Sequence, residues 1–199
     1  PWIQINDETS RFRWVPGSVG VAEVYAFNDK TRHPWFAPAG LNRGKIQAVQ
    51  AERKLLNSQR DTLYKNRVNP IATFPGQGVV VFGQKTLQKK SSALDRVNVR
   101  RLLIAVKKFI AASSRFLLFE QNTTKLREEF LNIANPFLLK VQSKSGLNDF
   151  RVVMDDTNNT PDTIDRNQLI GHIFLQPTKA AEFITIDFVI QRSGAEFNE

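Results

Sequence analysis

The 199-residue chain is 41% hydrophobic and 24% charged, which is enough apolar material for one substantial core and argues against disorder over most of its length. Its apolar runs are interrupted by Lys or Arg well short of the roughly 18 to 20 residues that a membrane span needs, so we expect a soluble protein. The net charge of +9 predicts attraction to nucleic acid, an anionic membrane or an acidic protein surface, without choosing among them.

The chain has no cysteine, which excludes a disulfide framework and a zinc ribbon and fits a protein made in a reducing cytoplasm. It opens on PWIQI, with no initiator Met and no charged-then-apolar leader. We therefore expect a fragment of something longer.

The first elements are short. Residues 14–17 (WVPG) are typical of a turn, and residues 18–26 space their apolar side chains at three and four positions. This spacing predicts a short helix with Ser18 near its N-cap.

Two prolines and a glycine in residues 33–40 predict an ordered loop whose aromatic rings, Trp35 and Phe36, lie on a core. The polar stretch 50–67 favours helix, and we expect two short helical turns broken near Asn57.

Residues 69–74 and 78–83 are rich in β-branched and aromatic side chains and are separated by a Pro-Gly pair, which predicts two strands of a hairpin. In residues 97–113 the apolar side chains fall on one helical face with Arg and Lys at its flanks, which predicts a helix. The segment 116–119 is too short and its side chains are too bulky to extend this helix.

A second helix begins after residues 122–124 (NTT) and runs to about Ser143, where Gly146 closes it. Pro136 implies a kink or a break within this helix.

The last part of the chain is rich in predicted strands, at residues 150–154, 168–175 and 183–190. The third of these alternates strictly, as a half-buried strand does. The predicted fold class is α+β, with a mixed sheet packed against two long helices and extended terminal arms for strand addition between subunits.

Catalytic, metal and cofactor sites are not expected. His33 and His172 are far apart and have no Cys partner, and His172 reads as a half-exposed strand residue rather than a ligand. The adjacent pairs 128–129 (EE) and 155–156 (DD) point in different directions on a helix or strand, so solvated faces and a turn cap explain them better than acid-base chemistry. Residues 76–78 (GQG) lack the rest of a phosphate loop and read as a turn.

The segment from Lys89 to Arg115 holds eight Lys or Arg residues against a single Asp. A solvated helix face and a functional surface both explain this pattern. Binding to nucleic acid bases would require aromatic side chains among exposed charges, whereas Phe109 and Phe116 fit the buried stripe. A basic nucleic-acid-binding module remains the alternative function.

Three stretches in register resemble the C-terminal region of contractile phage tail sheath proteins. Residues 70–87 (PIATFPGQGVVVFGQKTL) are similar to a family pattern of Phe-Pro-Gly-x-Gly, apolar residues, an aromatic and Gly before Thr-Leu. Residues 97–102 (VNVRRL) are similar to its Asn-Val-Arg-Arg-Leu, and residues 180–184 (AAEFI) to its Pro-Ala-Glu-Phe, with Ala180 in place of a common proline. Weaker similarity reaches back to residue 14.

The resemblance implies a virion structural protein without enzymatic activity or cofactor, assembled in the host cytoplasm. Its subunits would stack as six-fold rings into a helical sheath around a tail tube protein, with baseplate and tail terminator proteins as further partners and no direct contact with nucleic acid. Contraction of this injection system would drive the tube through the bacterial envelope. Arms at the termini would add strands to the sheets of neighbouring subunits.

On this reading, residues 1–68 lead into the conserved domain, residues 69–192 form it, and residues 193–199 are a C-terminal arm. Tube contacts in the family come from a helix of this inner domain, and Lys140 and Lys144 lie four residues apart on one face of the second long helix. Solvated lysines at a helix end are the alternative. The candidate contacts between subunits are Arg100, Arg101, Phe183, Ile184, Ile186, Phe188 and Ile190, with pairing inside the subunit as the alternative for the two arginines.

Overall fold

The computed structural model describes residues 1–186 and confirms the α+β class. In place of the one mixed sheet expected, these residues form three small antiparallel sheets, because each strand pairs with a neighbour of opposite direction. The helices are α1 (Gly17–Thr31), α2 (Asn57–Lys65), α3 (Val97–Ser114), α4 (Thr124–Ser143) and α5 (Pro161–Asp165). The strands are β1 (Trp2–Asn6), β2 (Phe12–Pro16), β3 (Gln50–Ala51), β4 (Ile71–Phe74), β5 (Gly78–Val81), β6 (Leu147–Val153) and β7 (His172–Pro177).

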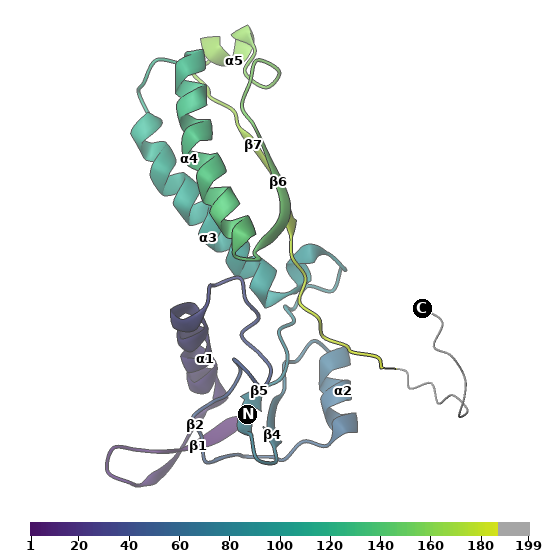
Figure 1. Ribbon diagram of the computed structural model, residues 1–199. Helices are drawn as coiled ribbons and strands as arrows, with labels where there is room; N and C mark the ends of the chain where they lie inside the picture. The colour runs from purple at the N-terminus through teal and green to yellow at the C-terminus, as the bar shows by residue number, and fades with distance from the viewer. Residues whose placement is uncertain (187–199) are drawn as a thin grey trace, which may run out of the picture.

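Figure 1 shows two halves, with α1, α2 and β1–β5 in one and the long helices α3 and α4 against the β6–β7 ribbon in the other. Among residues 1–186, no helix combines the length and the apolar character required to cross a membrane.

The first half departs from the sequence-based expectations at two places. Residues 14–16, expected in a turn, belong to β2, because Trp14 and Val15 pair with β1 in an antiparallel hairpin that satisfies their backbone groups. Gln50 and Ala51, expected to be helical, form β3 on the other side of β1. Only the later part of that stretch is helical, as the single helix α2.

Helix α1 is longer than expected, and Pro16 rather than Ser18 occupies its N-cap position, with no side-chain cap. It packs so closely on β1 that a Cβ atom added at Gly20 would lie 2.8 Å from Ile3. Ile3, Val24, Ile46 and Val79 are fully or almost fully buried in the core beneath α1.

The hairpin of β4 and β5 is confirmed, with Ile71 opposite Val81. Gly76 has a φ of 72°, a conformation that type II turns require at their third residue, and the Gln77 amide donates to the Phe74 carbonyl at 3.1 Å. The Pro-Gly pair therefore forms a turn, as expected.

The two long helices are confirmed close to their expected bounds. Their buried residues, led by Leu102 and Val106 on α3 and Leu138 and Val141 on α4, form one core with the inner face of the β6–β7 ribbon. Trp35 packs against this core, so the loop of residues 33–40 is ordered and links the two halves.

Helix α4 continues unbroken through Pro136. Proline cannot donate to the carbonyl four residues earlier, which belongs to Asn132, and both residues are exposed, so water can satisfy the freed carbonyl. After the helix, Ser145 rather than Gly146 takes the left-handed conformation, with a φ of 58°. Gly146 is needed for space, because a Cβ atom there would lie 2.6 Å from Val141.

The strands at 150–154 and 168–175 are confirmed with shifted bounds as β6 and β7. The third predicted strand is not formed at residues 183–186, which have no regular secondary structure because no other strand of residues 1–186 pairs with them. Phe188 and Ile190, the other candidate contacts between subunits on this predicted strand, lie outside the described residues.

Candidate assembly interface

Glu182 lies where the final segment crosses the junction of the two halves, and side chains from three parts of the chain hold it. Its carboxylate accepts hydrogen bonds from Arg96 Nε at 2.7 Å and from Arg96 Nη2 at 3.0 Å. The hydroxyl of Tyr64 and, at 3.4 Å, the amide of Gln84 also donate to it. We call Tyr64, Gln84, Arg96 and Glu182 the Glu182 cluster.

The positions of these residues in the fold explain why they converge. Arg96 is the N-cap residue of α3, Tyr64 is in the last turn of α2, and Gln84 follows β5. Each backbone position is therefore fixed by a packed element. The cluster joins the final segment to both halves of the molecule (Figure 1).

The electrostatics of the cluster favour a charged Glu182. Burial by itself raises the pKa of this carboxyl, but the hydrogen bonds from Arg96 and Tyr64 outweigh burial, so the pKa lies below its usual value. Burial and the hydrogen bond to Glu182 raise the pKa of Tyr64 to about 12. The hydrogen bond to Glu182 also raises the pKa of Arg96. At neutral pH Glu182 and Arg96 are both charged and form an ion pair, and the neutral Tyr64 donates a hydrogen bond to Glu182.

Lys85 supports the cluster from the side. Its Nζ donates to the backbone carbonyl of Tyr64 at 2.9 Å and lies 3.2 Å from the centre of the tyrosine ring. Burial, followed by the charge of Arg96, lowers the pKa of Lys85. The Tyr64 ring is thereby fixed on a second face.

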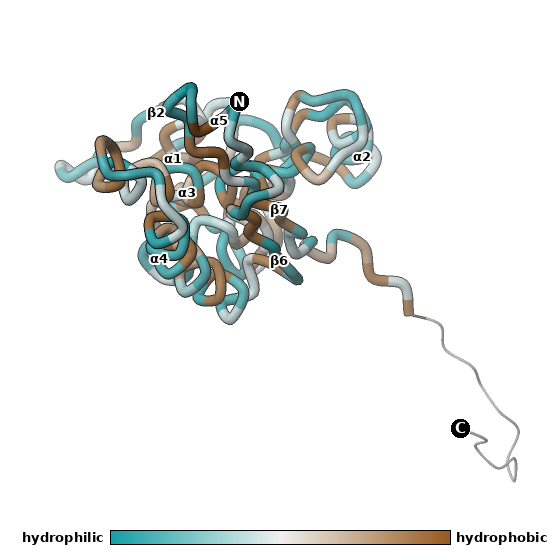
Figure 2. The backbone as a smooth tube through the Cα atoms, turned by 90° about the horizontal axis from the view of Figure 1, so that it is seen from above, coloured by the Kyte–Doolittle hydropathy of each residue, from teal (hydrophilic) through white to brown (hydrophobic). Residues whose placement is uncertain are grey.

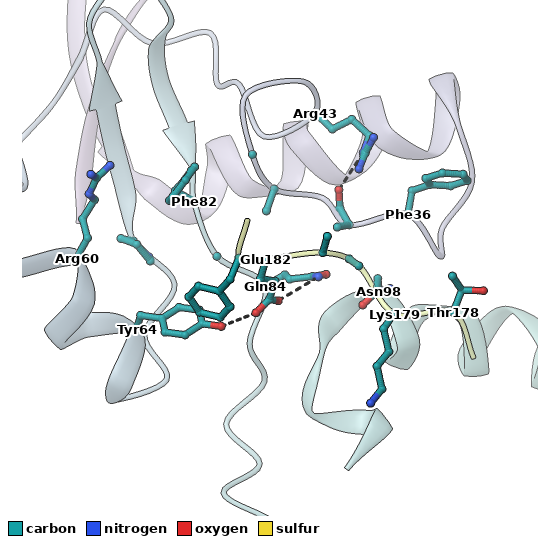
Figure 3. Close-up of a pocket in the computed structure, with 18 of the residues that line it drawn as sticks. Phe36, Arg43, Arg60, Tyr64, Phe82, Gln84, Asn98, Thr178, Lys179 and Glu182 are labelled. Carbon is teal, nitrogen blue, oxygen red and sulfur yellow. Dashed lines mark hydrogen bonds between the residues drawn. The ribbon is translucent and has the colours of Figure 1, made fainter. Parts of the chain in front are cut away.

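A hollow of about 670 Å³ adjoins the Glu182 cluster, with residues 178–183 along one wall (Figure 3). On other walls, arginine side chains lie over aromatic rings: Arg43 is 5.5 Å from the Phe36 centroid, and Arg60 is 5.5 Å from that of Phe82. Glu182 is already bound to Arg96, and Asp61 is the other carboxylate among the lining residues, beside the cations Arg43, Arg60 and Lys179. The charge that lines the hollow is therefore mainly positive.

Beyond Glu182 the segment turns outward. Phe183 packs edge-on against Tyr64, with ring centroids 5.9 Å apart, yet most of its surface is exposed. Ile184 and Ile186 are exposed at 82% and 66%. Figure 2 shows this stretch leading away from the body, with hydrophobic positions recurring along it. Three of the expected contact residues are therefore presented to solvent by the folded subunit.

The two candidate arginines of α3 have different surroundings. Arg101 bonds to Asp29 of α1 at 2.6 Å and lies 4.7 Å from the centre of the Tyr25 ring. Arg100 is exposed. The structure therefore pairs Arg101 within the subunit and leaves Arg100 facing outward.

The candidate tube contacts, Lys140 and Lys144, are both exposed at the end of α4. The backbone carbonyl of Lys144 accepts a hydrogen bond from Trp35 Nε1 at 2.9 Å. This bond fixes the backbone and leaves the lysine side chain on the surface.

The sequence reasoning did not identify the Glu182 cluster. Glu182 is 86 residues from Arg96 and 118 from Tyr64, and no local pattern connects positions so far apart. The one available signal was the similarity of residues 180–184 to a family motif that contains this glutamate.

Comparison with known proteins gives consistent results. Residues 89–191, about half of the chain, match the family of phage tail sheath C-terminal domains. The chain is 40% identical over 197 residues to the tail sheath protein of Vibrio phage KVP40, covering 98% of this chain and 29% of that protein. It is 38% identical over 188 residues to the tail sheath protein of Enterobacteria phage T4, covering 94% and 28%. It thus spans less than a third of the length of these relatives.

Solved structures show the same fold. The sheath complex of the extracellular contractile injection system PVC, in its contracted state, matches with a TM-score of 0.83 and 27% identity, covering 95% of this chain and 54% of that one. The baseplate structure of the anti-feeding prophage contains a chain that matches with a TM-score of 0.84 and 23% identity, covering 96% and 53%.

Proposed function

The chain belongs to the phage tail sheath family through its C-terminal domain, and from that premise we propose that it is the assembly module of a contractile tail sheath. In this role, copies stack as six-fold rings into a helical sheath around a tail tube, between baseplate and terminator proteins. Contraction of the sheath drives the tube through the host envelope. The chain acts as a structural component of the virion and not as an enzyme.

The observation that carries this proposal is the exposed segment at residues 183–186. It leads away from the body (Figure 2) from a fixed point, Glu182, and presents Ile184 and Ile186 to solvent. An extended segment with apolar side chains at alternate positions suits addition to the sheet edge of another chain. It supports assembly through strand exchange between subunits.

The β6–β7 ribbon is a suitable receiving sheet. It has only two strands within residues 1–186, so both of its outer edges have unpaired backbone groups. A two-stranded sheet is marginally stable by itself, and further strands from neighbouring copies would stabilise it. Such a contact joins different surfaces of the two copies, which suits a helical assembly.

The test uses the full-length sheath protein, with electron microscopy and sedimentation as readouts of tube assembly. The double substitution Ile184→Asp and Ile186→Asp should leave a folded monomer that does not polymerise, because two charges would enter the added strand. Thr185→Asp, on the other face of the same segment, is the matched control. Truncation after Gln191 should also prevent assembly. Normal tubes from both the double variant and the truncation would refute the proposal.

Phe109 and Phe116 are exposed and not buried in the stripe as expected. Direct binding of nucleic acid is still not favoured, because several of the cations are already engaged. Arg96 and Arg101 form ion pairs within the subunit, and Arg127 is buried against Asp156. A sheath module should show little affinity for DNA at physiological salt, whereas a DNA-binding module would show a steep dependence of affinity on salt.

A further inference from the structure

An exposed aromatic loop follows α3, at the end of the molecule farthest from the first half (Figure 1). Phe116 is 83% exposed, Leu118 is 63% exposed and Phe119 is fully exposed, while Leu117 between them is buried and anchors the loop. Phe119 has a φ of 69°, in the left-handed region that is unfavourable for an aromatic residue. Large rings held outward by a constrained backbone are typical of a surface that another protein covers.

Acidic side chains surround this loop. The same end of the molecule contains the start of α4 and the loops on either side of α5, and a hollow of about 990 Å³ is lined jointly by Phe119, Glu120, Leu126 and Leu169, so these segments lie together. The aromatic loop and the exposed carboxylates around it form what we call the acidic tip. These carboxylates are Glu120, Glu128, Glu129, Asp155 and Asp165, whereas Asp156 and Asp162 already pair with Arg127 and Arg166. The five other carboxylates outnumber the exposed cations Arg115 and Lys125 on the same segments, so the tip is net acidic.

A surface of opposite charge lies along α3. Arg100, Ile104, Lys107 and Lys108 are all exposed. Ile104 is four residues from Arg100, three from Lys107 and four from Lys108, which places all of them on one side of the helix. Helix α3 contains no Asp or Glu, and none of these three cations forms an ion pair with residues 1–186. Ile104, 49% exposed, gives this surface an apolar centre. We call it the basic face of α3.

We propose that the acidic tip of one copy docks on the basic face of α3 of a second copy. The two surfaces match in both respects that decide specificity, since each has an apolar centre and a charged rim of opposite sign. They occupy different places on one rigid subunit, so the contact is head-to-tail and continues from copy to copy. The inference rests on the proposed function and adds to it a contact between copies that does not use the C-terminal segment.

Charge reversal on each surface tests the inference in full-length sheath protein without tail tubes. The tip variant carries Glu120→Lys and Glu128→Lys, and the face variant carries Arg100→Glu and Lys107→Glu. Each pair of reversals should raise the protein concentration needed for assembly about tenfold, because two attractive pairs become repulsive. An equimolar mixture of the two variants should restore assembly, because each variant's tip is then opposite in charge to the other's face.

Lys54→Glu with Lys65→Glu, two exposed lysines elsewhere, is the control for net charge and should assemble like the wild type. Phe119→Ser should weaken assembly, whereas Leu87→Ser, at a leucine that is 84% exposed and lies outside both surfaces, should not. The inference is overturned if the mixture assembles no better than either variant alone. It is also overturned if the variants assemble normally by themselves and fail only on added tubes, since the surfaces would then bind the tube. Failure of the wild-type protein to assemble even with tubes would refute the proposed function itself.

Discussion

At the scale of single residues, Glu182 determines where the final segment leaves the subunit. A two-point bond between an arginine and a carboxylate fixes orientation as well as distance, and donors from Tyr64 and Gln84 satisfy the remaining acceptor positions. A charge that is partly buried is tolerated when it is paired and hydrogen-bonded in this way. The direction of residues 183–186 is thus set by the folded body.

The pKa shifts in the Glu182 cluster predict the pH range in which this segment stays docked. Glu182 has a lowered pKa, so its stabilisation of the docked segment is fully present above the ordinary pKa of 4.5 and is lost as the pH falls through the lowered pKa. Tyr64 has a raised pKa, so its stabilisation of the docked segment is fully present below pH 10.0, the ordinary pKa of tyrosine, and is lost as the pH rises toward about 12. Docking should therefore be constant from about pH 5 to pH 10 and weaken on both sides.

Because the chain has no cysteine, a fluorophore on a single Thr185→Cys variant can report docking by its anisotropy across the pH range. Adding Glu182→Gln should weaken docking about tenfold at neutral pH, through loss of a charge-assisted bond, and should abolish the acid transition. Adding Tyr64→Phe should abolish only the alkaline transition. Glu8→Gln, at an exposed carboxylate, is the control. If the acid transition persists in Glu182→Gln, another titratable group causes it.

At the scale of elements, the sequence predicted α3 and α4 well because their apolar residues repeat at the helical period over many turns. The β4–β5 hairpin was equally predictable from its Pro-Gly turn. The strand β2 was missed because WVPG resembles a turn locally, and only pairing with β1 makes it a strand. The Glu182 cluster was missed for the same reason on a larger scale, since long-range packing alone brings its members together.

Pro136 provides a test of how α4 is held. The helix is continuous although proline removes one backbone hydrogen bond, so packing of the buried stripe on α3 and β6 must outweigh that loss. Pro136→Ala should restore the bond to the Asn132 carbonyl and stabilise the folded chain by about 1–2 kcal/mol. Chemical denaturation measures this change.

Pro161→Ala is the matched control, because Pro161 is the first residue of α5, where no helical hydrogen bond is lost. It should change the free energy of unfolding by less than about 1 kcal/mol, and in the destabilising direction. A loss of stability in Pro136→Ala would show that the proline is required for the shape of α4.

At the scale of the whole molecule, three contacts between distant segments join the two halves. Arg101 binds Asp29, Trp35 binds the end of α4, and Glu182 binds Arg96 and Tyr64. These contacts have different chemistry and lie at separate places, so together they resist bending of one half against the other. We therefore expect sheath contraction to move subunits as rigid bodies, with the adjustment taken up by the connecting segments.

In the proposed sheath, a rigid subunit would present its charges to the tube in a fixed pattern, and Lys140 and Lys144 at the end of α4 are the predicted contact. Reversing both to Glu should reduce the fraction of tubes covered by sheath about tenfold near 0.1 M salt, and the difference from the wild type should shrink at high salt. The fold should survive, because the buried residues of α4 are others, including Phe130, Leu138 and Val141.

Microscopy of sheaths assembled with and without tubes separates this prediction from the contact between copies. The double reversal should leave assembly without tubes unchanged, in contrast to variants of the acidic tip or the basic face of α3. Lys54→Glu with Lys65→Glu again controls for net charge. If sheaths of the double reversal cover tubes and contract like the wild type, Lys140 and Lys144 are ordinary surface lysines whose role is limited to the favourable interaction of cations with a helix C-terminus.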